Sequence, residues 1–457
     1  MIDNILGIDL GTSSVKLIYS ENGVTVKERE GYDEISPDGW WRAICRAAKR
    51  MDLKNICAVG LSSQVGTYVT DDGICIEWNR KEGKNELCRI LDSVKCEEFL
   101  SEISMPHPMI VSYPLPRLLY LKEQYPRAKS VCMPKDLISE RLTGERVTDM
   151  YSWRGLSNLE RGGYSQSLIK RFGLEDLALP RIVSPFSKAG EVTTAASEKT
   201  GIKKGTPVYV GCNDFFSGLL GMGISRKGEV FDITGTSEHV GVIRENIPTD
   251  NGGLVCGPFF FDNVHYGVTA SSGPSFDFAS GLGELKNIAP YSSLKKKPPI
   301  FLPYLCGERA PIWDSSARGV FFGIERECQR EEMVYSVAEG VVFSLYHIYE
   351  CMGVPNGESI ITAGGAGSDP VLNKMKASLF GMNVKASSEK DSSALGAVMC
   401  AAVGEGEYGD LMEAMTDNVR YGDVIEPDLE LGKILKERFQ IYKRLYPALK
   451  SEFELLK

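Results

Sequence analysis

The residues of this chain best suited to chemistry stand in two short turns of similar composition. The first turn reads Asp-Leu-Gly-Thr-Ser at 9–13, and the second reads Thr-Gly-Thr-Ser at 234–237. A glycine lets an anion approach the main-chain N–H groups of a turn, and the hydroxyl groups add further donors. Both turns therefore suit phosphate oxygens, although an ordinary hairpin turn uses the same residue types. The carboxylate of Asp9 suits Mg²⁺, either directly or through a water molecule.

The second copy of the turn strengthens the case for phosphate binding. Gly11 and Gly235 lie about half the length of the 457-residue chain apart, and each follows a β-rich run and precedes another. Two halves of a chain that each begin with the same turn between β-rich runs indicate a duplicated domain. On facing domains, the two turns could hold one polyphosphate from both sides.

A third candidate is the aspartate of Gly-Cys-Asn-Asp at 211–214. Asp214 follows a β-rich run at 207–210 and precedes a small-residue helix expected at 217–223. Phosphoryl transfer needs positioning, charge neutralisation and a base that accepts the proton of the attacking hydroxyl. A carboxylate at a strand end can be that base. The alternative interpretation is that Asp214 is only the N-cap of the helix.

A fourth candidate is the glycine-rich turn Ala-Gly-Gly-Ala-Gly at 363–367. Asp369 and Pro370 follow it as N-cap and first residue of an expected helix, and a helix N-terminus favours negative charge. Gly364 and Gly365 would let a nucleotide lie flat against the main chain. A plain connection between a strand and a helix remains the alternative. The sequence contains no P-loop motif.

The elements that must position these turns alternate between strands and helices, which predicts an α/β protein. The length favours two domains, and we expect them at 1–224 and 225–457. Asn-Gly at 22–23 predicts a hairpin turn. We expect strands at 5–10, 14–20, 24–30, 229–234, 239–243, 265–270 and 359–362, and helices at 37–51, 331–350, 370–380, 393–403 and 430–457.

Composition excludes several other classes of protein. The net charge is −9, and no basic face is evident in the sequence. We therefore expect no nucleic-acid partner. No apolar run is long enough to cross a membrane, and the N-terminus does not read as a secretion signal. None of the 12 cysteines forms a C-x-x-C pair, which indicates reduced thiols and a cytoplasmic location. The four histidines lack metal-ligand spacing, so we expect no zinc site.

In this order and spacing, the four elements resemble the FGGY family of carbohydrate kinases from Ile5 to about Gly404. Two longer stretches add specificity. Residues 301–311, Phe-Leu-Pro-Tyr-Leu-Cys-Gly-Glu-Arg-Ala-Pro, resemble a loop of xylulose and gluconate kinases, and residues 319–323 match the C-terminal signature. The resemblance implies two ribonuclease H-like domains of the actin and hexokinase type with a central cleft. It also implies ATP, Mg²⁺ and a sugar as ligands, and homodimers are common in the family.

The resemblance also implies a role for individual residues. Asp214 matches the catalytic base, and Asp9 matches the acidic residue that positions Mg²⁺. The expected nucleotide contacts are Gly11, Thr12, Ser13, Lys16, Gly235, Thr236, Ser237, Gly364, Gly365 and Ala366. The expected sugar contacts are Gln64, Val65, Gly66, Trp78, Asn79, Asp214 and Phe215.

Departures from the family pattern concern the sugar side. Xylulose kinases usually carry Gln-Met-His-Gly where this chain has Gln-Val-Gly-Thr at 64–67, and the acid of their Trp-Asn-Asp is Arg80 here. We expect a ketopentose such as D-xylulose as the acceptor. The alternatives are gluconate, whose carboxylate would need a cation such as Arg80 or Arg154, or a polyol. Alternatives of another class are a non-catalytic sugar- or nucleotide-binding regulator and an actin- or Hsp70-like ATPase.

Overall fold

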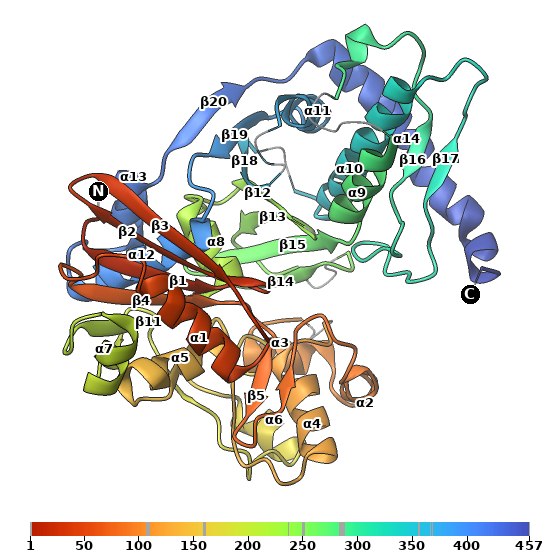
Figure 1. Cartoon of the computed structure of the whole chain (residues 1–457). Helices are drawn as coiled ribbons and strands as arrows, with labels where there is room; N and C mark the ends of the chain where they lie inside the picture. Colours follow the sequence, from red (N-terminus) through yellow and green to blue (C-terminus); the bar gives the residue numbers. More distant parts are fainter. Residues whose placement is uncertain are drawn as a thin grey trace. The chain divides into compact units, whose positions relative to one another are not determined.

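The computed structural model describes residues 2–106, 110–158, 161–235, 237–248, 252–282, 288–354, 357–365, 367 and 369–456 (Figure 1). These residues fold into two compact units. The first comprises 1–223 and 391–419, and the second comprises 224–390 and 420–457. Within these ranges, no helix combines the length and the apolar character that a membrane span requires.

The division into units differs from the expected domains in one respect. The segment 391–419, expected in the second domain, belongs to the first unit. Its helix α12 (Ser392–Glu405) packs on strands β1 (Ile5–Leu10) and β4 (Ala58–Ser63) and on helix α8 (Asp214–Gly221), and the blue helix lies beside red strands in Figure 1. The chain therefore returns to the first unit late in the sequence.

Close approach explains why α12 packs there. A Cβ atom on Gly60 would lie 2.0 Å from the carbonyl oxygen of Ala397, and one on Gly396 would lie 2.0 Å from that of Ser217. Only glycine permits this main-chain contact, so the small-residue face of α12 matches a small-residue face of its neighbours.

The first unit is built on a six-stranded sheet in the order β10-β11-β4-β1-β2-β3. Strands β1, β4 and β11 run parallel, while β2, β3 and β10 are antiparallel to their neighbours. Its further elements are β2 (Ser14–Glu21), β3 (Val24–Gly31), α1 (Pro37–Ala48), β5 (Tyr68–Thr70), β6 (Cys75–Ile76), α2 (Lys84–Ser93), α3 (Cys96–Ile103), α4 (Pro114–Gln124), β7 (Val131–Cys132), α5 (Pro134–Thr143), β8 (Val147–Asp149), α6 (Gln166–Arg171), β9 (Arg181–Val183), β10 (Lys188–Glu191), α7 (Thr194–Thr200), β11 (Pro207–Asn213) and α13 (Leu411–Asn418).

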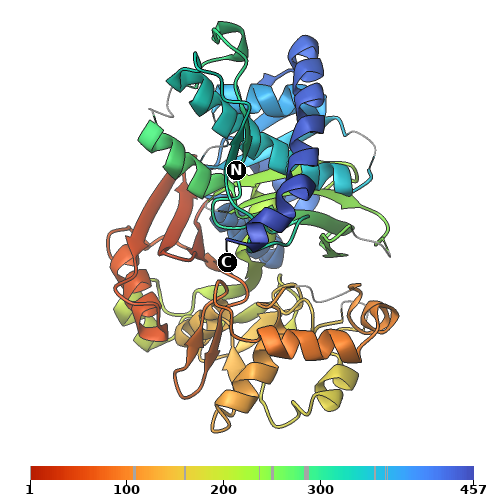
Figure 2. The ribbon, with the colours of Figure 1, turned by 90° about the vertical axis from the view of Figure 1, so that its right-hand side faces the viewer.

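The second unit is built on a seven-stranded sheet in the order β14-β15-β13-β12-β18-β19-β20. The long helices α10 and α14 pack side by side through aromatic contacts such as Phe343 with Phe439, and both views show them together (Figures 1 and 2). Its elements are β12 (Val230–Thr234), β13 (Glu238–Arg244), β14 (Val255–Pro258), β15 (Asn263–Thr269), α9 (Ser272–Leu282), η2 (Tyr291–Ser293), β16 (Ile300–Leu302), β17 (Val320–Phe322), α10 (Arg330–Cys351), β18 (Ser359–Gly364), α11 (Pro370–Phe380), β19 (Asn383–Ser387), β20 (Tyr421–Ile425) and α14 (Leu429–Glu454).

The two large sheets share one strand pattern. Five neighbouring strands of each sheet pair in the same pattern, with two antiparallel pairings followed by two parallel ones. These strands are β3-β2-β1-β4-β11 in the first unit and β15-β13-β12-β18-β19 in the second. The first predicted phosphate turn joins β1 to β2, and the second joins β12 to β13. The duplication inferred from the two turns is therefore present in the strand topology.

Most of the predicted elements near the site are confirmed to within a few residues. Asn22 and Gly23 both have positive φ, 51° and 76°, as the predicted hairpin turn requires. Asp369 caps α11 by accepting hydrogen bonds from the N–H groups of Val371 and Leu372 at 2.9 and 2.8 Å. Four helix boundaries were wrong. Helix α1 ends at Ala48, α12 continues to Glu405, α14 ends at Glu454, and α8 spans Asp214–Gly221 instead of 217–223.

Candidate functional site

The predicted acceptor residues come together because three parallel strands of the first unit end at one edge. Leu10 of β1 and Asn213 of β11 both pair with Ser63 of β4. Gly11, Gln64 and Asp214 are the next residues of the three strands. The carboxyl ends of parallel strands meet at the same edge, which is where α/β proteins commonly bind ligands.

Asp9 lies just inside this edge and is almost fully buried, with 2% exposure. The hydroxyl of Ser62 donates to its Oδ1 at 3.0 Å, and Lys16 Nζ lies 3.7 Å from its Oδ2. Burial raises the pKa of Asp9, and the charge of Lys16 opposes the rise. A nearby positive charge stabilises the ionised form of this buried carboxylate. Asp9 therefore suits Mg²⁺, which prefers one or two carboxylates together with substrate phosphates.

The first phosphate turn is held by its own main chain and by Tyr32. The N–H of Gly11 donates to the carbonyl of Ser14 at 3.0 Å, which closes the turn. The Tyr32 hydroxyl donates to the carbonyl of Gly11 at 3.0 Å. The side chains of Thr12 and Ser13 are exposed at the tip. Tyr32 was not among the predicted residues, since a single tyrosine in a loop gives no motif.

Asp214 is the first residue of α8, and the N-cap of that helix is Asn213, whose side chain accepts from the N–H of Phe216 at 2.9 Å. The alternative that Asp214 is only an N-cap is therefore wrong. Its carboxylate accepts hydrogen bonds from the N–H groups of Phe215, at 2.9 Å, and of Val65. Burial raises the pKa of Asp214 to about 7, the charge of Asp9 adds to the rise, and Lys16 opposes it.

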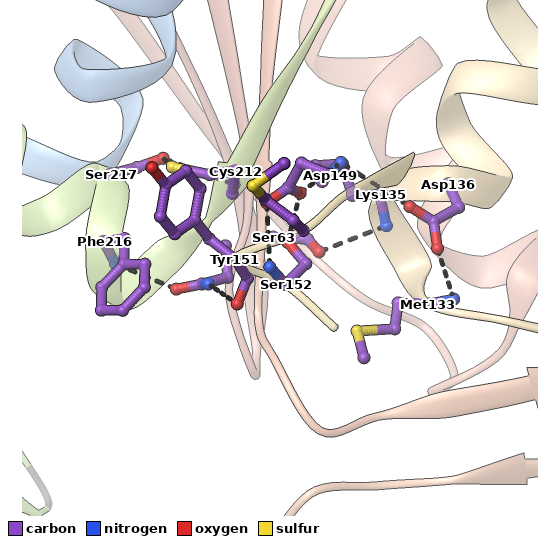
Figure 3. A network of polar contacts seen from close by, with 12 residues as sticks. Ser63, Met133, Lys135, Asp136, Asp149, Tyr151, Ser152, Cys212, Phe216 and Ser217 are labelled. Carbon is purple, nitrogen blue, oxygen red and sulfur yellow. Dashed lines mark hydrogen bonds and ion pairs between the residues drawn. The ribbon is translucent and has the colours of Figure 1, made fainter. Parts of the chain in front are cut away.

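A buried polar network supports the strand end that carries Asp214 (Figure 3). The amide of Asn213 donates to the carbonyl of Tyr151 at 3.1 Å. The ammonium of Lys135 lies 3.1 Å from a carboxylate oxygen of Asp149, and both side chains are buried. The main-chain N–H of Lys135 donates to the hydroxyl of Ser63 at 3.2 Å. These contacts fix the ends of β4 and β11, and with them the position of Asp214.

The predicted sugar contacts occupy the same edge. Gln64 is 2% exposed, and neither polar atom of its amide has a hydrogen-bond partner among the described residues. Val65 is 36% exposed, and its N–H binds Asp214. The indole N–H of Trp78 donates to the hydroxyl of Thr12 at 3.1 Å. Of the other predicted contacts, Gly66 lies next to Val65, Asn79 is exposed beside Trp78, and Phe215 is half-buried next to Asp214.

The second turn follows β12 in the second unit. Gly235 and Ser237 lie at its two ends, and the predicted contact Thr236 lies outside the described residues. The guanidinium of Arg309 donates to the hydroxyl of Ser237 at 3.4 Å. Arg309 was not among the predicted site residues, although it lies in the loop at 301–311 that carried the family resemblance.

The glycine-rich turn begins at the end of β18, beside the second phosphate turn. Gly364 pairs with Thr234 across the parallel strands β18 and β12. Its φ is 98°, and a Cβ atom there would lie 1.9 Å from the carbonyl oxygen of Thr234, so glycine is required for packing. A Cβ atom on Gly365 would meet nothing within 4 Å, which leaves that position open. Ala366 lies outside the described residues.

A buried charge cluster lies beneath the second turn, on the strands that flank it. Lys376 of α11 forms ion pairs with Asp232 of β12 and, at 2.9 Å, with Glu238 of β13. Burial raises the pKa of Asp232 to about 8, Glu238 adds to the rise, and Lys376 opposes it. For Glu238, burial acts to raise the pKa, but the charge of Lys376 and the side-chain hydrogen bonds with Asp232, Ser272 and Lys376 together lower it. The Lys376 ammonium therefore faces Glu238, whose ionised form is favoured, and Asp232, whose ionised form is disfavoured by burial.

Comparison with known proteins shows to which family the chain belongs. Residues 4–221 match the N-terminal domain of the FGGY family of carbohydrate kinases, and residues 233–405 match its C-terminal domain. The chain belongs to this family. It is an ATP-dependent carbohydrate kinase. The family membership removes the two alternatives of another class, a non-catalytic regulator and an actin- or Hsp70-like ATPase.

Relatives of this FGGY kinase act on more than one sugar. The chain is 26% identical to a xylulose kinase of Staphylococcus epidermidis, over 98% of this chain and 97% of that one. It is 28% identical to a gluconokinase of Bacillus subtilis, over 92% and 91%. The crystal structure of a gluconate kinase from Lactobacillus acidophilus superposes with a TM-score of 0.85 at 25% identity, covering 99% of both chains. The ligand-bound xylulose kinase from the same species reaches 0.86 at 24%, covering both chains fully.

Proposed function

We propose that this FGGY kinase transfers the γ-phosphate of ATP to a hydroxyl of a ketopentose such as D-xylulose, with Asp214 as the base. The observation that carries the proposal is the place of the Asp214 carboxylate. It stands at the strand edge beside the first phosphate turn, and its pKa of about 7 lets it accept a proton near neutral pH. Several relatives that match nearly the whole chain are xylulose kinases.

The mechanism begins with the acceptor at this edge. The amide of Gln64, buried and without a described partner, offers one donor group and one acceptor group for sugar hydroxyls. Asp214 accepts a hydrogen bond from the reacting hydroxyl, which orients the oxygen lone pair toward the γ-phosphorus. As the new O–P bond forms and the bond to the ADP oxygen breaks, the hydroxyl proton moves to a carboxylate oxygen of Asp214.

The phosphate turns supply charge and hydrogen bonds for the group that moves. Phosphoryl transfer depends mainly on positioning and on stabilising the charge of the phosphate oxygens. Mg²⁺, when bound with the nucleotide, would neutralise part of that charge, and Asp9 is the residue placed to hold it. Thr12 and Ser13 offer hydroxyl donors from the first turn, and Ser237 offers one from the second.

The second unit contains a cavity suited to the base of the nucleotide. It has a volume of about 300 Å³, and its walls include Tyr291, Tyr335, Val371, Met375 and Leu431. Val371 and Met375 belong to the first half of α11, the helix that follows the glycine-rich turn. Apolar and aromatic side chains are the usual lining of a site for a flat heterocycle. We assign the adenine of ATP to this cavity.

Gluconate is the second candidate acceptor, and one observation favours it. The guanidinium of Arg154 lies 4.9 Å from the ring centre of Phe216, in the helix that Asp214 begins, and 3.3 Å from the hydroxyl of Tyr113. This cation could bind a carboxylate of the acceptor. The other candidate cation, Arg80, is exposed and bonded to Glu82 at 3.1 Å.

A substrate panel tests the proposed acceptor. With ATP and Mg²⁺, we expect the highest kcat/KM for D-xylulose among D-xylulose, D-ribulose, gluconate, xylitol and glycerol, measured by coupled detection of ADP. A higher kcat/KM for gluconate would select the second candidate and reject the ketopentose. If gluconate wins, Arg154→Met should raise its KM and leave the KM of ATP unchanged.

The pH profile tests the role of the base. Because Asp214 must be ionised to accept a proton, kcat/KM for the sugar should fall as the pH drops below about 7. One titrating group predicts a loss of about tenfold for each further pH unit. The residual activity of Asp214→Asn should lack this acid limb. An unchanged limb in that variant would assign the titration to another group.

A further inference from the structure

The loop at 77–80 is held by a buried arginine. Arg117 of α4 is fully buried, and its Nη2 donates to the carbonyls of Glu77, Trp78 and Arg80 at 3.1, 3.4 and 2.8 Å. No carboxylate of the described residues forms an ion pair with it, and burial lowers its pKa. Arg117 is a buried cation, and these three carbonyl oxygens accept its hydrogen bonds. Moving any of the carbonyls away would weaken the contacts of the buried charge, which is unfavourable. The loop therefore has one strongly preferred conformation.

Trp78 connects this loop to two other segments of the first unit. Its main-chain N–H donates to the hydroxyl of Thr67, at 3.2 Å, just before β5. Its indole N–H donates to the hydroxyl of Thr12, at 3.1 Å, in the first phosphate turn. One residue of the predicted sugar loop thus contacts the turn that is predicted to bind phosphate.

The direction of the indole hydrogen bond has a chemical consequence. An indole N–H can only donate, so the oxygen of Thr12 must accept. The hydroxyl proton of Thr12 then cannot point at the indole and is left to donate elsewhere. A hydroxyl that accepts one hydrogen bond is also a stronger donor in the next. The contact therefore prepares the Thr12 hydroxyl to donate to a phosphate oxygen.

We propose that Trp78 is a positioning residue that links acceptor binding to phosphoryl transfer through the Thr12 hydroxyl, in a loop whose conformation Arg117 fixes. The proposal rests on the proposed function, since it takes Thr12 as a phosphate contact and the loop at 77–80 as part of the acceptor site. The loop that would receive the acceptor thus also holds the indole N–H against Thr12, so that the Thr12 hydroxyl is oriented toward the phosphate group that moves.

A double-mutant cycle tests the link. Trp78→Phe keeps an aromatic ring and removes the N–H, and Thr12→Val keeps the shape and removes the hydroxyl. If the hydrogen bond orients Thr12, Trp78→Phe should lower kcat about three- to tenfold and change the KM of the sugar less than about twofold. In the Thr12→Val background, Trp78→Phe should have no further effect on kcat. Two independent effects that multiply would overturn the proposal.

Arg117 provides a second measurement on the same link. Arg117→Lys keeps a cation that can reach one or two of the three carbonyls, whereas Arg117→Met keeps none. We expect kcat in the order parent, Arg117→Lys, Arg117→Met, and we expect Trp78→Phe to lower kcat less in the Arg117→Met background than in the parent. An equal effect in both backgrounds would show that Arg117 does not act through Trp78.

The outcomes separate this proposal from the proposed function. If Asp214→Asn loses its activity but the effects at Trp78 and Thr12 multiply, the kinase mechanism stands and only the link fails. If Asp214→Asn keeps its activity, the assignment of the base fails, whatever the cycle shows.

Discussion

Replacing Asp214 by asparagine should lower kcat by about 10²- to 10⁴-fold, the usual contribution of a general base. Asparagine has the same shape, and its carbonyl oxygen can still accept from the N–H groups of Phe215 and Val65. The change therefore removes the proton acceptor and leaves the local structure in place. The KM of the sugar should change little, because its other contacts remain.

Three measurements make this test specific. The affinity for ATP, measured by calorimetry, should be unchanged, because the assigned adenine cavity belongs to the second unit. The urea midpoint should not fall, because a buried carboxylate whose pKa is raised disfavours the folded state when it is ionised. The matched control is Asp391→Asn, a carboxylate of the same unit that contacts Lys16 at 3.8 Å and should lower kcat by less than about tenfold. Equal activity of Asp214→Asn and the parent enzyme would remove Asp214 from the mechanism.

The parts of the site that the sequence predicted are those encoded locally. A Gly-Thr-Ser turn between two β-rich runs determines its own conformation, and Asp214 follows its strand directly. Both could therefore be located from the sequence without knowledge of the fold. The same reasoning located the hairpin at Asn22 and the cap at Asp369. Their functional roles stay predictions until the variants are measured.

The parts that the sequence did not predict depend on contacts between distant segments. The hydroxyl of Ser62 binds Asp9 from a neighbouring strand, and Tyr32 binds the first turn from the end of a hairpin. Helix α12 packs in the first unit because Gly60 of β4 leaves room for the carbonyl of Ala397, and Gly396 leaves room for that of Ser217. None of these pairings leaves a periodic signal, since each partner alone is an ordinary serine, tyrosine or glycine.

The buried charge cluster under the second phosphate turn also depends on contacts between distant segments. Removing its lysine is expected to have a large effect on stability. Lys376 and Asp232 are 144 residues apart in the sequence, yet the ion pair between them is almost completely buried. The cluster joins α11 to the two strands that flank the turn. Lys376 therefore holds together the strand ends from which Gly235 and Ser237 extend.

Replacing Lys376 by methionine should destabilise the protein by about 3–5 kcal/mol, because it leaves the ionised Glu238 buried without its cation. The urea midpoint measures the loss. Lys433→Met is the matched control, since Lys433 forms an exposed pair with Glu430 and its loss should change stability by less than about 1 kcal/mol.

Removing the orphaned charge as well should restore part of that stability. In the double variant Lys376→Met and Glu238→Gln, the carboxylate of Glu238 is gone, and burial favours the neutral form of Asp232. We therefore expect a urea midpoint between those of Lys376→Met and the parent. If the double variant is no more stable than Lys376→Met, the loss comes from packing around the lysine stem and not from the unpaired carboxylate. A parent-like midpoint for Lys376→Met itself would show that the cluster adds nothing to the support of the second turn.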